Sequence, residues 1–106
     1  MIFITGPLYS GKRTFARRLG GRCIAEVQQL AAAAPDLEAL AQSLAAEYDV
    51  VLATEVGGGV VPVDPEQRRA REQAGRLACL LAARAGVVVQ MFCGIPTVLK
   101  GELPEC

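Results

Sequence analysis

A glycine-rich stretch near the start of the chain has the residue types that hold phosphate. Residues 6–14 read GPLYSGKRT, which departs at one place from the pattern G-x-x-x-x-G-K-[ST]. Glycines let the backbone curl so that successive N–H groups point at phosphate oxygens, and the lysine reaches the β- and γ-phosphates. The predicted phosphate-binding residues are Gly6, Pro7, Leu8, Tyr9, Ser10, Gly11, Lys12, Arg13 and Thr14. The alternative is a structural turn without a ligand.

The departure is Arg13, which stands where the pattern has a hydroxyl that coordinates Mg²⁺. An arginine carries only donors and a fixed charge, so it cannot be a metal ligand. Three outcomes are open. Thr14 takes over the hydroxyl's role, or the ion is held by nucleotide, water and a carboxylate elsewhere, or Arg13 itself neutralises phosphate charge and weakens the need for metal. The first is the least favoured, because one residue along a helix turns a side chain by about 100°.

Glu55 is the best candidate among the carboxylates for holding the ion. It follows a predicted strand at residues 50–54, and α/β sheets place ligands beyond the carboxyl ends of their strands. We therefore predict Glu55 as the metal ligand and, with Lys12, as a catalytic residue. Glu26 is a second candidate on a weaker predicted strand, and Asp49 is expected at the opposite end of the sheet. An exposed loop residue or a cap is the alternative for Glu55.

These residues must be positioned by strands that alternate with helices. An apolar run at residues 2–5 that ends at a glycine indicates a buried parallel strand. Further strands are predicted at 23–27, 50–54, 87–92 and 98–100, helices at 11–19, 37–45 and from 65 to a stop at Gly86, and a turn at 94–96. The strand at 87–92 is apolar on both faces and is expected to be central. The pattern predicts an α/β, P-loop NTPase-like three-layer fold with a small, mainly parallel sheet.

The composition limits the class of protein. The chain has 106 residues, 52 % of them hydrophobic and 21 % charged, which predicts one globular domain spanning residues 1–106. The formal net charge is zero, so nothing indicates a nucleic-acid or membrane-surface partner. Four cysteines lack metal-type spacing and there is no histidine to join them. Without a signal peptide or membrane span, we expect reduced cysteines and a cytoplasmic protein. Its small, alanine-rich core makes assembly into an oligomer plausible.

Together with the loop, several later segments resemble the adenosylcobinamide kinase/adenosylcobinamide-phosphate guanylyltransferase family. The matching pieces are Ser10-Gly11-Lys12, Glu55-Val56-Gly57, Gly59-Val60-Val61-Pro62, Arg71-Glu72, Ala74-Gly75-Arg76, Gly94-Ile95-Pro96 and Leu99-Lys100. The similarity covers about residues 1–20 and 49–100. It implies a kinase of cobalamin biosynthesis that uses ATP or GTP on a corrinoid alcohol, and a compact homo-oligomer, a trimer. The residues leave ATP and GTP open.

The chain also departs from that family. It lacks most of the family's middle segment, and with no histidine it cannot form the family's guanylated histidine. Thr54 and Ala78 each stand where the family has an Asn, and Gly86 stands where it has an Asp.

Two hypotheses follow, with a structural relic that oligomerises as a third. In a minimal kinase, Lys12 and the loop backbone stabilise phosphate charge, Glu55 holds Mg²⁺ or orients the acceptor hydroxyl, and Thr14 touches the α-phosphate. In a binding module, the chain holds nucleotide or phosphate and acts through a partner.

Overall fold

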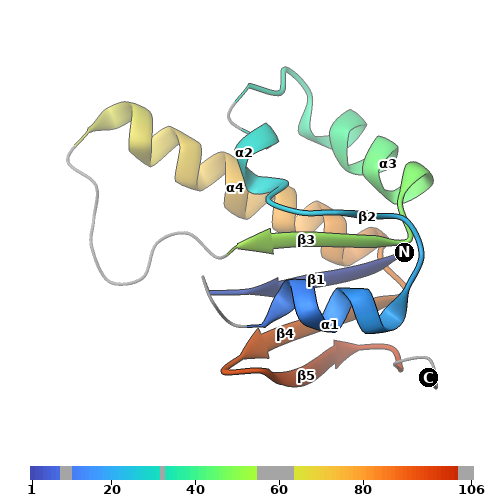
Figure 1. The fold of residues 1–106 in the computed structure, drawn as a ribbon. Helices are drawn as coiled ribbons and strands as arrows, with labels where there is room; N and C mark the ends of the chain where they lie inside the picture. Colours follow the sequence, from blue (N-terminus) through green and yellow to red (C-terminus); the bar gives the residue numbers. More distant parts are fainter. Residues whose placement is uncertain (8–10, 32, 55–63, 103–106) are drawn as a thin grey trace.

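The computed structural model of this chain describes residues 1–7, 11–31, 33–54 and 64–102. Strands and helices alternate along most of it (Figure 1). The elements are β1 (Ile2–Gly6), α1 (Lys12–Leu19), β2 (Cys23–Ile24), α2 (Gln28–Ala31), α3 (Leu37–Glu47), β3 (Val50–Thr54), α4 (Pro65–Arg84), β4 (Val87–Phe92) and β5 (Ile95–Lys100). The sheet has the order β2-β3-β1-β4-β5. Its first four strands are parallel, and β5 is antiparallel to β4.

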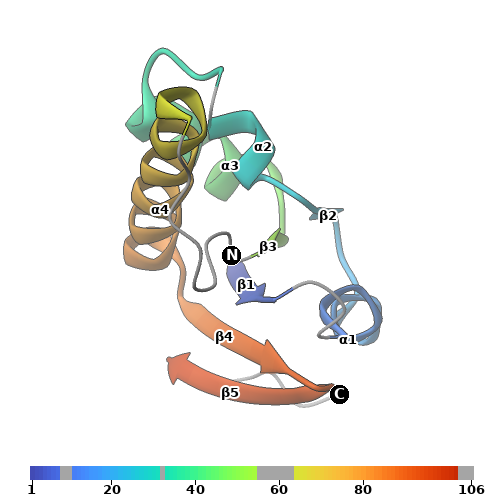
Figure 2. The same cartoon turned by 90° about the vertical axis from the view of Figure 1, so that its left-hand side faces the viewer.

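Helices cover both faces of this sheet. Figure 2 shows α1 on one face and α2, α3 and α4 on the other. Two buried clusters match this arrangement, because side chains alternate between the faces of a strand. Phe3 and Val51 belong to the cluster that contains buried residues of α3 and α4, among them Leu44 and Leu77. Ile4 and Leu52 belong to the second cluster, with Ala16 of α1. The predicted α/β three-layer fold with a mainly parallel sheet is therefore confirmed.

The two long helices begin at aspartate caps, and the start of α4 agrees with the sequence prediction. The carboxylate of Asp64 caps α4 by accepting the backbone N–H of Glu66, and a proline takes the first turn. Asp36 caps α3 in the same way, accepting the N–H groups of Glu38 and Ala39. Below its cap, α4 buries Ala74, Leu77 and Leu81 against the sheet, at the spacing of one helical face. The helix ends at Arg84, two residues before Gly86.

Two local predictions were wrong. β2 contains two residues instead of five, because the chain turns at Glu26, whose φ is 59°, and enters the short helix α2. The turn after β4 lies at Cys93 and Gly94, both with positive φ, so β5 starts at Ile95 and is longer than predicted. The expected central position of the strand at 87–92 is confirmed, because β4 pairs with β1 on one side and with the edge strand β5 on the other.

Candidate phosphate-binding site

The phosphate loop begins where two neighbouring parallel strands end. Gly6, the last residue of β1, is paired in register with Thr54, the last residue of β3. The carboxyl ends of both strands therefore lie at the same edge of the sheet, which is where α/β folds bind ligands. Asp49 lies at the other end of β3, where its carboxylate accepts the backbone N–H of Arg22 at 2.9 Å. The prediction that Asp49 lies away from this edge is confirmed.

Gly11 joins the loop to helix α1. It is the N-cap of the helix, with φ 90° and ψ 12°, and makes no side-chain capping bond. The first turn of α1 contains no acidic residue, so its N–H groups and the helix dipole suit an anion. A Cβ at Gly11 would lie 3.2 Å from Cα of Gly94 in the β4–β5 turn. Both the positive φ and this close contact favour glycine.

Lys12, the first residue of α1, reaches back to Pro7 at the start of the loop. Its Nζ donates a hydrogen bond of 2.8 Å to the carbonyl oxygen of Pro7, and the residue is only 6 % exposed. The positive charge is thus held beside the backbone of the loop, close to the N-terminus of α1. That placement favours a bound anion.

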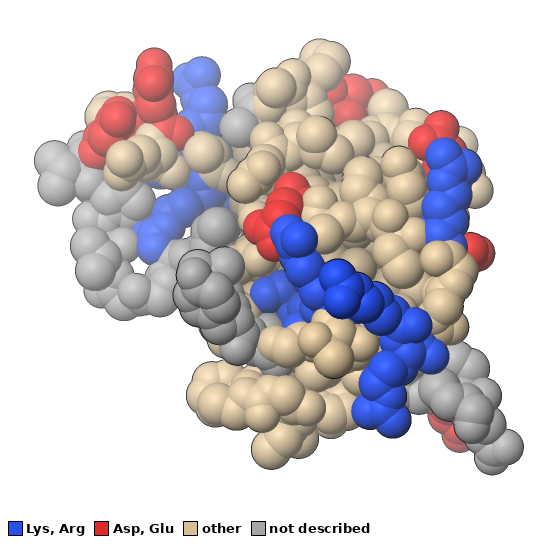
Figure 3. All heavy atoms as spheres, in the orientation of Figure 1, with Lys and Arg blue, Asp and Glu red and all other residues tan. Residues whose placement is uncertain are grey.

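Arg13 and Thr14 follow on the first turn of α1, and both are exposed. The Nη2 atom of Arg13 lies 3.9 Å from Oε1 of Glu26, and the Arg13 side chain is 69 % exposed. In the space-filling view, lysine and arginine side chains gather over α1 (Figure 3). The basic residues of this helix are Lys12, Arg13, Arg17 and Arg18. This face of the molecule is therefore locally positive although the chain has no net charge.

Among the described residues, Glu26 is a carboxylate that contacts the first turn of α1 through Arg13. The hydroxyl of Thr54 donates to both of its oxygens, at 2.9 and 3.1 Å, and Nε2 of Gln28 donates at 2.6 Å. The Gln28 hydrogen bond, followed by the Thr54 bond and the charges of Lys12 and Arg13, lowers the pKa of Glu26 below its ordinary value against the opposing effect of burial. Glu26 is therefore ionised at neutral pH.

Gln28 fixes the geometry of this cluster. Its amide oxygen accepts the backbone N–H of Thr54 at 3.0 Å while its nitrogen holds Glu26. The side chain thus bridges the end of β3 and the turn after β2. The sequence analysis named Glu26 as a second candidate metal ligand. It noted Thr54 only because this residue replaces an Asn of the family, and it did not identify Gln28. Two polar residues that follow a strand, Glu26 and Gln28, were the sequence pattern that could have predicted this cluster.

Several predicted site residues lie outside the described part of the chain. They are Leu8, Tyr9, Ser10 and Glu55. The described site residues are Gly6 and Pro7 at the end of β1, and Gly11, Lys12, Arg13 and Thr14 at the start of α1. Glu26 joins them from the neighbouring strand end through its contact with Arg13.

The described residues do not fit the usual magnesium site of such a loop. Arg13 occupies the position of the ligating hydroxyl and offers only donors. Both oxygens of Glu26 already accept hydrogen bonds from Thr54 and one also accepts from Gln28. Within the described ranges, no group of three or more His, Cys, Asp or Glu residues is arranged to hold a metal ion. Cys23, Cys79 and Cys93 are free and exposed.

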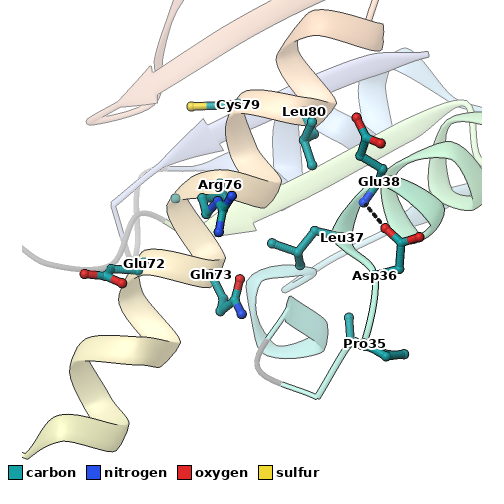
Figure 4. A pocket seen from close by; sticks show the side chains of 11 residues that line it. Pro35, Asp36, Leu37, Glu38, Glu72, Gln73, Arg76, Cys79 and Leu80 are labelled. Atoms are coloured by element: carbon teal, nitrogen blue, oxygen red, sulfur yellow. Dashed lines mark hydrogen bonds between the residues drawn. The ribbon is translucent and has the colours of Figure 1, made fainter.

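A separate cavity of about 850 Å³ lies on the opposite side of the sheet, between the start of α3 and the middle of α4. In Figure 4, Leu37 of α3 and the side chains of Gln73 and Arg76 of α4 lie around it. Its lining includes no residue of the phosphate loop. It is therefore not part of the phosphate site.

Comparison with known proteins identifies the family. Residues 26–99 match the family model described as cobinamide kinase / cobinamide phosphate guanyltransferase. The match begins at Glu26, so it includes the cluster formed by Glu26, Gln28 and Thr54 and excludes residues 6–14 of the phosphate loop. A search of curated proteins gave no match. In the part of the chain that the structure describes, no helix is both long and apolar enough to cross a membrane. Because the family match covers well over half of the chain, the protein belongs to the cobinamide kinase / cobinamide phosphate guanyltransferase family.

Proposed function

We propose that this chain binds ATP or GTP through residues 6–14 and transfers the γ-phosphoryl group to an alcohol such as adenosylcobinamide. The observation that carries the proposal is the position of Lys12. This buried lysine, at the start of α1, donates to the carbonyl oxygen of Pro7, at the sheet edge where β1 and β3 both end. Membership of a cobinamide kinase family supplies the class of acceptor.

The reaction exchanges one phosphorus–oxygen bond for another. The acceptor hydroxyl attacks the γ-phosphorus and loses its proton, while the bond to the β-phosphate breaks and the nucleoside diphosphate leaves. Lys12 and the loop backbone would stabilise the negative charge on the phosphate oxygens. Thr14 would contact the α-phosphate. Glu55 is proposed to orient the acceptor hydroxyl or to hold a metal ion, and it lies outside the described residues.

The guanylyl transfer of the family is not part of this proposal. A covalent guanylate on histidine requires a histidine, and this chain has none. The proposed activity is therefore the kinase half-reaction alone.

A second candidate is a nucleotide-binding module without catalysis. Arg13 at the position of the metal-ligating hydroxyl favours it, because phosphoryl transfer in P-loop enzymes ordinarily uses the ion to neutralise developing charge. In this alternative the chain would hold nucleotide and act through a partner.

A transfer assay with labelled ATP and GTP separates the two candidates. Cobinamide and adenosylcobinamide serve as acceptors, and Lys12→Ala is compared with Arg17→Ala. Arg17 is an exposed residue in the last turn of α1, so its variant should transfer phosphate at the wild-type rate. The kinase proposal expects labelled cobinamide phosphate from wild type and at least about 100-fold less from Lys12→Ala. Binding of nucleotide without any transfer would favour the module.

We also propose that the chain forms one domain over residues 1–106, works in the cytoplasm and assembles into a homo-oligomer, a trimer by family resemblance. Support for the assembly comes from the β4–β5 hairpin, where Phe92, Ile95 and Leu99 are exposed although they are large and apolar. Apolar side chains gathered on one hairpin are typical of surfaces that contact another protein.

A further inference from the structure

The electrostatics of the loop pose a problem for any bound polyphosphate. An ionised Glu26 lies close enough to Lys12 and Arg13 for their charges to lower its pKa. A carboxylate beside a phosphate site repels the ligand unless a cation separates them. In the usual loop that cation is a magnesium ion. The described residues here do not fit the ion, and a positive side chain placed between Glu26 and the phosphates would reduce the same repulsion.

Arg13 has the properties that this role needs. It extends from the first turn of α1, next to the N–H groups that suit phosphate, and ends 3.9 Å from Glu26. Since its side chain is 69 % exposed, the ion pair with Glu26 is weak and the long side chain can move without unpacking the core. A guanidinium binds phosphate oxygens with two parallel hydrogen bonds, which is a stronger interaction than this single solvent-exposed contact.

Glu26, in contrast, is held in place. Thr54 and Gln28 donate to its carboxylate from the end of β3 and the start of α2. Its φ of 59° is a conformation that a glutamate adopts at a cost, and such strain persists only where the surroundings impose it. Glu26 therefore offers a fixed contact for the exposed Arg13 side chain.

We propose that Arg13 is the built-in counter-charge of this phosphate loop: it exchanges its contact with Glu26 for the phosphates of a nucleotide when one binds, so that binding requires no divalent cation. The inference rests on the proposed nucleotide binding but concerns binding only. It holds for the kinase and for the module.

Calorimetric titration tests this directly. ATP, GTP and tripolyphosphate are titrated into the full chain in Mg²⁺ and in EDTA. The wild type is compared with Arg13→Ser, which restores the hydroxyl of the common pattern, with Glu26→Gln, and with the exposed control Arg17→Ser. Circular dichroism melting checks that each variant folds.

The expected result has three parts. Wild type and Arg17→Ser bind with dissociation constants in EDTA within about threefold of those in Mg²⁺. Arg13→Ser binds at least about tenfold more weakly than wild type in EDTA, and Mg²⁺ restores much of the loss. Glu26→Gln binds about two- to fivefold more tightly than wild type in EDTA, because a negative charge is removed and Arg13 is released.

Two results would overturn the inference while leaving phosphate binding intact. They are a loss of more than about tenfold in wild-type affinity on chelation, and equal affinities of Arg13→Ser and wild type in EDTA. Failure of the proposed function looks different. Wild type would then bind nothing in either buffer, or Lys12→Ala would bind as wild type does, and the inference would fall with it.

Discussion

The hydrogen bond between Thr54 and Glu26 should be a measurable part of the stability of this fold. Thr54→Val keeps the shape of the side chain and removes the hydroxyl that donates to both carboxylate oxygens. A hydrogen bond to a charged group contributes roughly 1.5–3 kcal/mol. The Glu26 side chain is 26 % exposed, so solvent screening reduces that figure, and we expect a loss of about 1 kcal/mol in the free energy of unfolding at pH 7.

The loss should depend on pH with a defined sign. The pKa of Glu26 is lowered in the folded protein, so the group contributes stability above its unfolded pKa, whose ordinary value is 4.5. That contribution disappears as the pH falls through the lower folded-state pKa. Since Thr54 is one of the causes of the lowered pKa, the difference between wild type and Thr54→Val should shrink below the unfolded pKa.

Urea unfolding of a double-mutant cycle measures this contribution. Wild type, Thr54→Val, Glu26→Gln and the double variant are unfolded at pH 7 and at about pH 3. Thr97→Val, on the exposed strand β5, is the matched control and should change stability little at either pH. A coupling energy near zero at pH 7, or one that is equal at both pH values, would refute the reasoning.

Three further predictions concern packing and assembly. Gly75→Ala should raise the free energy of unfolding by about 1 kcal/mol, because a Cβ there meets nothing within 4 Å and alanine is the better helix former; a lower urea midpoint would contradict this. Gly101→Ala should destabilise by at least about 1 kcal/mol in the same assay, since φ is 72° and the new Cβ would clash with the carbonyl oxygen of Gly86; unchanged stability would show that the chain end relaxes freely. Light scattering should give three times the chain mass of 11.2 kDa, and a monomer would contradict the proposed trimer.

Local chemistry made much of this fold predictable. The apolar strand ending at Gly6, the glycine before Lys12 and the Asp64-Pro65 cap each act within a few residues. Such signals are visible in a sequence because their energy comes from neighbours along the chain. The family resemblance was recognised on the same kind of evidence, from short segments in a fixed order, and the family match confirmed it.

The cluster formed by Glu26, Gln28 and Thr54 was harder to predict because it depends on contacts between residues that are distant in sequence. Gln28 and Thr54 are 26 residues apart in sequence and meet only when β2 pairs with β3. The positive φ of Glu26, which shortens β2 and turns its carboxylate toward Thr54, has no signature in the residue type. The Cys93-Gly94 turn was missed for a similar reason, since a cysteine with positive φ is uncommon.

The most direct test of the account is whether nucleotide binding depends on Lys12. ATP and GTP are titrated into wild type and Lys12→Ala, with Arg17→Ala as the folded control on the same helix. The account predicts micromolar binding of at least one nucleotide to wild type and to Arg17→Ala, and its loss in Lys12→Ala. Wild-type protein that binds neither nucleotide, or a Lys12→Ala variant that binds as tightly as wild type, would contradict the central claim.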